Sequence, residues 1–197
     1  MKTFRLNTIT ICSFIATFFL SGLNTSFAQA KYHAETLALS ITGTSSLHDW
    51  EMTSGKGQVD AMILVANDKV TFSRLSFTVP AESLKSGHGA MDKNTYKALD
   101  TKKNANISFV LVSGNVTPTG ANTYLLKGIG KLTISGTTLQ TDLVATLKYN
   151  PADKSFTCSG IKKFKMSEYG VKPPTVMMGA IKTGDAISIS YNLTIKS

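Results

Sequence analysis

Ile187-Ser188-Ile189-Ser190-Tyr191-Asn192-Leu193-Thr194-Ile195 is the stretch that decides the fold, because apolar and polar residues alternate along its whole length. Side chains of a β-strand point to opposite faces in turn, so this pattern predicts a strand with one buried face. Runs of the same period recur upstream, at 37–41, 58–66, 70–79, 107–111, 124–134, 139–149 and 156–160. Turn signals such as Asn67-Asp68 and Ser135-Gly136 separate them.

These segments predict an all-β fold, an eight-stranded antiparallel barrel in which the last strand pairs with the first. Closing the ring removes the exposed sheet edges. A shift of apolar phase between Phe72 and Leu75 predicts a β-bulge. Gly128 and Gly130, inside a strand, predict strong bending or a close approach of neighbouring groups. The interior of such a barrel is either filled by side chains or holds one small ligand, and the residues leave both open.

Two segments break the strand pattern. Residues 91–99 have apolar residues at helical spacing, with Asp92 near the start, where the helix dipole favours a carboxylate. This segment predicts one short helix over an end of the barrel. Residues 166–184 predict a long loop, in which Val176, Met177 and Met178 form either a flexible apolar lid or a plain packed loop.

The first thirty residues predict a secretory signal peptide. Lys2 and Arg5 precede a mostly apolar run, and Ala28-Gln29-Ala30 fits a cleavage site. We therefore expect a signal peptide at 1–30 and one domain at 31–197, periplasmic or secreted after cleavage near Ala30. Cys158 is the one cysteine of that domain, in a strand-like context typical of a small buried residue.

The charge of the chain argues against a nucleic-acid partner. Its 21 basic and 12 acidic residues give a net charge of +9, and without Lys2 and Arg5 the counts are 19 and 12, a net +7. The lysines are dispersed rather than gathered in a stripe with aromatic residues between them. Two interpretations remain open, a soluble surface rich in lysine and transient contact with an anionic membrane surface.

Gly43-Thr44-Ser45-Ser46-Leu47-His48-Asp49-Trp50 is the stretch that most resembles a site. His48 and Asp49 could form a base with its orienting partner, but neither a nucleophile elbow nor oxyanion glycines accompany them. Such hydroxyl and Asp side chains usually bond to local backbone, so we predict no catalytic residue and no enzyme. The histidines lack metal-ligand spacing, and no metal site is predicted. Trp50 either plugs one end of the barrel or touches a ligand.

Three stretches together resemble a known family. They are 43–50, Ser86-Gly87-His88-Gly89-Ala90-Met91-Asp92-Lys93-Asn94-Thr95-Tyr96-Lys97-Ala98-Leu99, and Met166-Ser167-Glu168-Tyr169-Gly170 with Pro173-Pro174. In this order, after a signal peptide, they resemble the YceI-like family of bacterial periplasmic proteins, also called polyisoprenoid-binding proteins. The resemblance implies a lipocalin-like barrel with a long apolar tunnel for an isoprenoid chain, such as a polyprenyl or prenyl-quinone tail. It implies no catalytic role.

The resemblance favours a cavity, and the inward-facing apolar residues then become candidates for ligand binding. The predicted set is Trp50, Phe72, Phe77, Phe109, Leu126, Leu143, Leu147, Met177, Met178, Ile189 and Tyr191. The predicted function is an exported protein that binds an isoprenoid lipid for carriage, storage or sequestration, with no cofactor besides that ligand. The alternatives are a structural or stress-response barrel with a filled core and a lipid-modifying enzyme that uses His48 and Asp49. A homodimer and a monomer both remain open.

Overall fold

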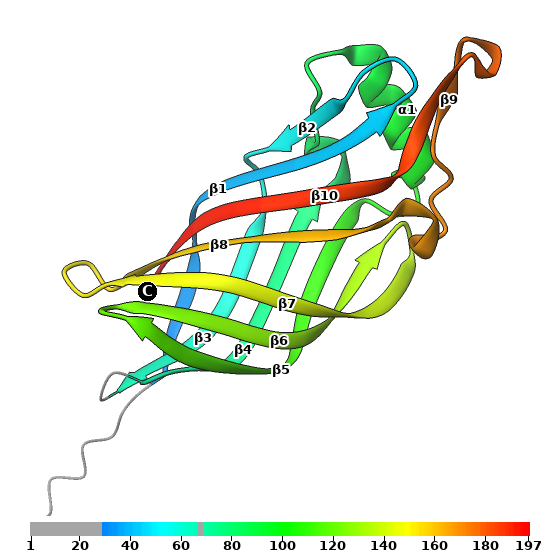
Figure 1. Ribbon diagram of the computed structural model, residues 1–197. Helices are drawn as coiled ribbons and strands as arrows, with labels where there is room; N and C mark the ends of the chain where they lie inside the picture. Colours follow the sequence, from blue (N-terminus) through cyan, green and yellow to red (C-terminus); the bar gives the residue numbers. More distant parts are fainter. Residues whose placement is uncertain (1–28, 67–68) are drawn as a thin grey trace, which may run out of the picture.

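The computed structural model describes residues 29–66 and 69–197 and is an antiparallel β-barrel (Figure 1). Eight strands form the barrel: β1 (Ala30–Ser45), β3 (Gln58–Ala66), β4 (Lys69–Pro80), β5 (Asn106–Gly120), β6 (Thr123–Ile134), β7 (Thr137–Asn150), β8 (Ser155–Lys165) and β10 (Ile181–Lys196). Two short strands add to it, β2 (Trp50–Ser54) and β9 (Thr175–Val176). The predicted eight-stranded lipocalin-like architecture is confirmed.

The last strand closes the ring, as its alternation predicted. β10 pairs with β1 on one side, for example Tyr191 with Leu39, and with β8 on the other, for example Leu193 with Cys158. Paired residues point to the same side of a sheet. The apolar residues of β10 therefore share the interior with those of β1 and β8.

β2 and β3 behave as one interrupted strand along β1. Leu39 pairs with Ser54 and His33 pairs with Asp60, six residues further along each strand, so the register is the same on both sides of the break. Residues 55–57 do not pair with β1 between them. Because of the break, β2 leaves the barrel wall. It continues the pairing along β1 beyond the ring, towards the end of the barrel that α1 covers (Figure 1).

The predicted local irregularities of the wall are present. The register of β3 with β4 skips Ser73, so the bulge lies between Phe72 and Leu75 as expected. At Gly130 an added Cβ would lie 2.7 Å from the carbonyl oxygen of Val110, which confirms the predicted close approach. The predicted turn at 67–68 and nearly all of the predicted signal peptide lie outside the described residues. Ala30 is the first residue of β1.

The predicted helix is α1 (Gly89–Leu99), which lies over one end of the barrel. Asp92 is nearly buried in its first turn and accepts hydrogen bonds from the Ser86 hydroxyl at 2.7 Å and the Ser86 backbone N–H at 2.8 Å. These bonds lower the pKa of the Asp92 carboxyl. The Tyr96 hydroxyl reaches the carbonyl oxygens of Glu82 and Leu84. The helix is therefore fixed to the chain segment that precedes it.

The predicted loop at 166–184 contains more regular structure than expected. It holds two 3₁₀ turns, η2 (Met166–Tyr169) and η3 (Met177–Gly179), and β9 pairs with the start of β10. β10 already begins at Ile181. A further 3₁₀ turn, η1 (Ala81–Ser83), follows β4. In the described part of the chain, no helix has the length and apolar character needed to cross a membrane.

Candidate ligand-binding cavity

The upper part of the barrel, below α1, is hollow. Its cavity measures about 660 Å³, within the roughly 300–1,000 Å³ of small-molecule pockets. Side chains from all eight barrel strands, β2 and α1 line it, and most are apolar. Lining residues include Leu39, Ile41, Met52, Val79, Met91, Ala98, Ile107, Leu132, Phe164, Ile187 and Leu193.

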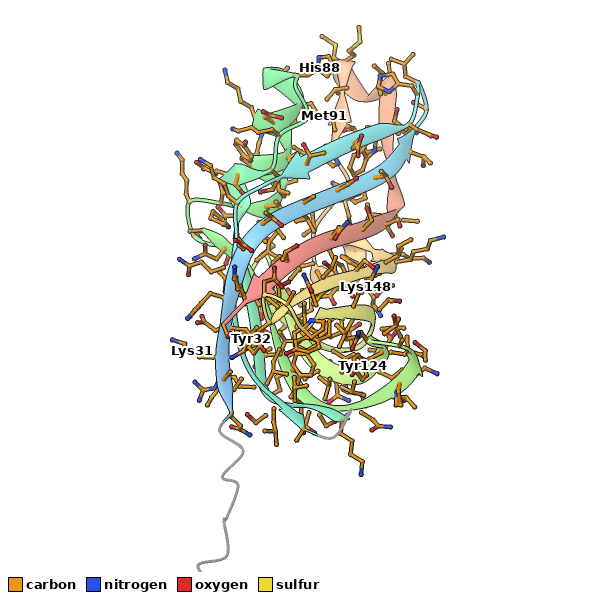
Figure 2. The ribbon with its side chains drawn as sticks, turned by 90° about the vertical axis from the view of Figure 1, so that its left-hand side faces the viewer. Lys31, Tyr32, His88, Met91, Tyr124 and Lys148 are labelled. Carbon is orange, nitrogen blue, oxygen red and sulfur yellow. The ribbon has the colours of Figure 1, made fainter. Side chains whose placement is uncertain are left out.

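Packed aromatic rings close the other end of the barrel, which we call the floor. Phe156 is fully buried, and its ring lies 5.6 Å from that of Tyr32 and 4.7 Å from that of Tyr149, centre to centre. Tyr124 is buried in the same cluster. Figure 2 shows Tyr32 and Tyr124 towards one end of the barrel and Met91 of α1 at the other. The cavity is thus closed below by side chains and covered above by the helix.

Three aromatic side chains of the cavity lie against glycines of a neighbouring strand. An added Cβ at Gly130 would overlap the Phe109 ring, and one at Gly160 would overlap the Tyr191 phenol. At Gly43 it would lie 2.7 Å from Cε2 of Trp50. Because a ring can occupy the space above a glycine, these side chains lie along the wall and leave the barrel axis free.

The mouth of the cavity lies between α1 and the turn from β1 to β2, where Leu47, His48, His88 and Met91 line it. The Trp50 indole N–H donates to the Thr44 carbonyl oxygen at 2.9 Å. This bond fixes the large ring at the mouth, with its polar end satisfied by backbone. Trp50 therefore both seals the β1–β2 turn and contributes to the cavity lining.

The His48–Asp49 pair does not have catalytic geometry. His48 Nδ1 lies 2.7 Å from the Asp49 backbone carbonyl oxygen. The Ser45 hydroxyl donates to the His48 carbonyl oxygen and accepts from the backbone N–H groups of Leu47 and His48. The Ser45 hydroxyl therefore bonds to local backbone, as the sequence predicted, whereas the Ser46 hydroxyl accepts from the backbone N–H of Lys182 on β10. No group of three or more His, Cys, Asp or Glu in residues 29–66 and 69–197 is placed to hold a metal ion.

Two titratable groups of the lining stay protonated. Burial raises the pKa of the Cys158 thiol to about 12. Burial, with a smaller contribution from Cys158, raises the pKa of the Tyr191 hydroxyl to about 12. The Tyr191 hydroxyl donates to the Val144 carbonyl oxygen at 3.0 Å. The deep part of the cavity therefore presents uncharged groups at neutral pH, which suits an apolar occupant.

The structure brings nine of the eleven predicted binding residues together around the cavity. They are Trp50, Phe72, Phe77, Phe109, Leu126, Leu143, Leu147, Ile189 and Tyr191. Met177 and Met178 lie outside the lining, with 73% and 110% relative exposure, although Val176 of the same predicted lid lines the cavity. The part that these residues take in binding stays a prediction, because the structure holds no ligand.

Sequence reasoning missed a number of lining residues, and one of them is a lysine. Lys162 pairs with Ile189, whose side chain lines the cavity, so the lysine is rooted on the inner face of β8. The signal was present, because Cys158, Gly160 and Lys162 share one strand face. The inward position of Lys162 was nevertheless not predicted, because a run of lysines at 162–163 indicates an exposed surface and charged residues are almost never buried.

A closed antiparallel barrel with an apolar cavity under a short helix defines the chain as a lipocalin-like barrel protein. Comparison with protein families gives the particular family. The model of the YceI-like domain matches residues 24–195, and the chain belongs to this family. The resemblance of its three motif stretches is thereby confirmed.

Solved structures share the fold. BcnA from Burkholderia cenocepacia is 21% identical with a TM-score of 0.61, over 80% of this chain and 95% of that one. A polyisoprenoid binding domain from Saccharophagus degradans, implicated in plant cell wall breakdown, is 9% identical with a TM-score of 0.60, over 84% and 98%. The YCEI protein of Campylobacter jejuni is 18% identical with a TM-score of 0.52, over 72% and 84%. A search of curated proteins found no match.

Proposed function

We propose that this protein is an exported binding protein that holds an isoprenoid lipid, of the polyprenyl or prenyl-quinone type, in its barrel cavity. It carries, stores or sequesters the lipid and performs no chemistry on it. The observation that carries the proposal is the apolar cavity of about 660 Å³ beneath α1. The shared fold of a domain described as polyisoprenoid binding supports the class of ligand.

The physical basis is the transfer of an apolar chain out of water. Burying about 400 Å² of prenyl surface contributes on the order of 10 kcal/mol at about 25 cal/mol per Å². Part of this offsets the loss of translational and conformational freedom. A preformed cavity with Phe109, Tyr191 and Trp50 held against its wall keeps the ordering cost on the protein side small.

The cavity also bears on the alternatives. A structural barrel with a filled core does not fit a hollow upper half. A lipid-modifying enzyme would need His48 and Asp49, whose side chains lack a catalytic arrangement. A double variant, His48→Ala with Asp49→Ala, is expected to keep full ligand binding, since neither group is needed to hold an apolar chain.

The proposal is tested by what the native protein contains and what it takes up. Mass spectrometry of organic extracts should detect a prenyl lipid, and titration with a prenyl quinone or a polyprenyl phosphate should saturate. Leu143→Trp places a large ring in the lining and should weaken binding at least about tenfold. Val112→Trp adds the same ring on the outer face, where Val112 is 58% exposed, and should leave binding unchanged. No extracted lipid and no uptake of either probe would remove the proposal.

A further inference from the structure

The wall of the barrel opens between β7 and β8. Their hydrogen-bonded pairing runs from Asn150 with Ser155 to Thr146 with Ser159 and stops there. Beyond that point β7 stays paired with β6, and β8 stays paired with β10. The segments 137–145 and 160–165 are therefore each held by one neighbouring strand. We call the gap between them the seam.

A tyrosine occupies the place where the pairing stops. Tyr191 of β10 reaches past Gly160 and donates its hydroxyl to the Val144 carbonyl oxygen, which β8 leaves unpaired. A Cβ at Gly160 would lie 2.6 Å from that same oxygen and would overlap the phenol. Because Gly160 has no side chain, the Tyr191 hydroxyl fits between β7 and β8 at this point.

A lysine crosses the seam. Lys162 is rooted on the inner face, beside Ile189, yet its ammonium group bonds the carboxylate of Asp142, whose side chain is 71% exposed. The cavity lining includes Asp142, Val144, Ile161 and Lys162, from both edges of the gap. Because Val144 and Ile161 are themselves exposed, the cavity reaches the outer surface at the seam.

The outer face around the seam is unusually apolar. Among the described residues, large exposed hydrophobic side chains fall into two groups. Leu47, Met177 and Met178 lie towards the helix end, and the others stand on the four consecutive strands β5 to β8. The second group is Val110, Val112, Ile129, Val144 and Ile161. We call the outer face of β5 to β8 the basic wall, for the charges that accompany these residues.

Positive charge gathers on the same strands. β5 to β8 carry six basic residues and one acidic residue, a net charge of +5: Lys127, Lys131, Lys148, Lys162, Lys163 and Lys165 against Asp142. β1 to β4 carry three of each, a net charge of zero: Lys31, Lys69 and Arg74 against Glu35, Glu51 and Asp60. Figure 2 labels Lys148 on β7 and Lys31 on β1. An apolar face ringed by lysines is complementary to an anionic lipid surface.

We propose that the basic wall docks on an anionic lipid bilayer and that the seam is a lateral portal, through which a lipid chain passes between bilayer and cavity. Val144 and Ile161 contact the acyl region beside the portal, and the lysines contact the head groups. The chain then enters sideways without crossing water, and α1 need not move. The portal rests on the proposed function, whereas the docking face does not, since vesicle binding needs no ligand in the cavity.

The docking face is tested by sedimentation with phosphatidylglycerol vesicles. Lys127→Glu with Lys163→Glu should reduce the bound fraction at least fivefold. Lys69→Glu with Arg74→Glu makes the same change of net charge on β4, in the group of strands β1 to β4 whose charges sum to zero, and should leave the bound fraction unchanged. Equal losses from both pairs, or no sedimentation of the unaltered protein, would overturn the docking face.

A second pair of variants separates the basic wall from the mouth. Leu47→Ser with Met178→Ser removes exposed apolar side chains there and should leave sedimentation unchanged. Val144→Ser with Ile161→Ser should reduce it at least threefold. The reverse pattern would place the membrane contact at the mouth and overturn the proposal.

The portal is tested by a covalent cross-link, or staple, between β7 and β8 across the seam. Val144 and Ile161 each lie two residues beyond the last ladder pair, on the two edges of the seam, and cysteines there are joined with a bis-maleimide. The thiol of Cys158 does not compete, because burial raises its pKa to about 12. The control staple joins cysteines at Thr133 and Thr138, a pair on the same wall whose hydroxyls lie 2.8 Å apart in the unbroken β6–β7 ladder.

The measurement is the rate of transfer of a fluorescent prenyl probe from phosphatidylglycerol vesicles, beside its equilibrium binding from ethanol without vesicles. Each stapled protein is compared with the same double-cysteine variant before cross-linking, since Val144 and Ile161 belong to the cavity lining. Cross-linking the seam should slow transfer at least tenfold without changing the equilibrium binding of that variant, while cross-linking the control pair changes neither. Unchanged transfer through a stapled seam would overturn the portal. Failure of the unaltered protein to bind the probe without vesicles would remove the proposed function and the portal, and the sedimentation result would still decide the docking face.

Discussion

The floor and the cavity of this barrel are built from the same kinds of residue and reach opposite results. At the floor, Phe156 pairs with Tyr149 and Ile195, so side chains meet from both sides and the rings fill the axis. In the cavity, Phe109 and Tyr191 lie against glycines and stay along the wall. Whether a small barrel is hollow is therefore set as much by the residue opposite each ring as by the ring itself.

The largest expected effect comes from Phe156→Ala. Removing a fully buried ring from the floor should cost about 3–5 kcal/mol of unfolding free energy. Phe109→Ala is the matched change in the cavity and should cost about 2 kcal/mol less, because one side of its ring already borders empty space. Urea unfolding of both variants measures the difference. Equal losses would mean that the two ends are packed alike and would break the comparison.

Gly130→Ala should fill part of the cavity with the Phe109 ring, as aromatic rings fill the floor. The new methyl group would meet the Phe109 ring and the Val110 carbonyl oxygen, so the ring must swing towards the axis. We expect a loss of about 1–3 kcal/mol in stability and at least about tenfold weaker binding of a prenyl probe. Gly120→Ala, whose nearest neighbour would be the Thr123 side chain at 4.0 Å, is the control. Unaltered probe affinity in Gly130→Ala would show that the glycine does not keep the axis free.

Tyr191→Phe sharpens the comparison by keeping the ring and removing the hydroxyl. The Val144 carbonyl oxygen then loses its donor, at a cost of about 1 kcal/mol. Since Gly160 is unchanged, the ring should stay along the wall and probe affinity should change less than about twofold. Thermal unfolding and probe titration together check this. A large loss of affinity would assign the hydroxyl a direct part in binding.

The smallest effect concerns Cys158, which lies where cavity and floor meet. Its thiol should resist iodoacetamide at pH 8 in the folded protein and react fully in urea, since burial raises its pKa to about 12. The ordinary pKa of a cysteine thiol is 9.0, so the unfolded chain loses this proton first as pH rises. The contribution of the thiol to stability is therefore complete below pH 9 and declines from there towards pH 12. Rapid labelling of the folded protein would show that water reaches this depth.

The fold could be predicted from the alternation of apolar residues, because the two-residue period of a strand is a backbone property that tertiary contacts leave unchanged. Ile189 and Leu193 on the final strand were enough to predict ring closure, and Phe72 with Leu75 marked the bulge. The residues predicted to face the barrel interior followed from the same alternation. Met177 and Met178 obeyed no such rule, because they sit in a 3₁₀ turn where backbone geometry, not strand parity, directs side chains.

What the sequence could not supply depends on pairs that are distant along the chain. Tyr191 meets Val144, and Gly130 meets Phe109, only after the register of two ladders is known. The seam is also a matter of where a ladder stops, which leaves no mark in the alternation of β7 or β8. Lys162 could have been placed inward by parity, since it follows Cys158 and Gly160 on one face.

The pairing of β1 with β10 has a consequence for how the chain folds. The two strands are joined at eleven register positions, from His33 with Lys196 to Ser45 with Thr183. Nearly the whole polypeptide must therefore be looped together before the ring can close, which gives a high contact order and slow folding. Until β10 is in place, β1 and β8 both present bare edges to any other chain. Deleting residues 188–197 removes nine of these eleven pairs and should leave an open sheet that aggregates, even though every residue of the cavity mouth is still present.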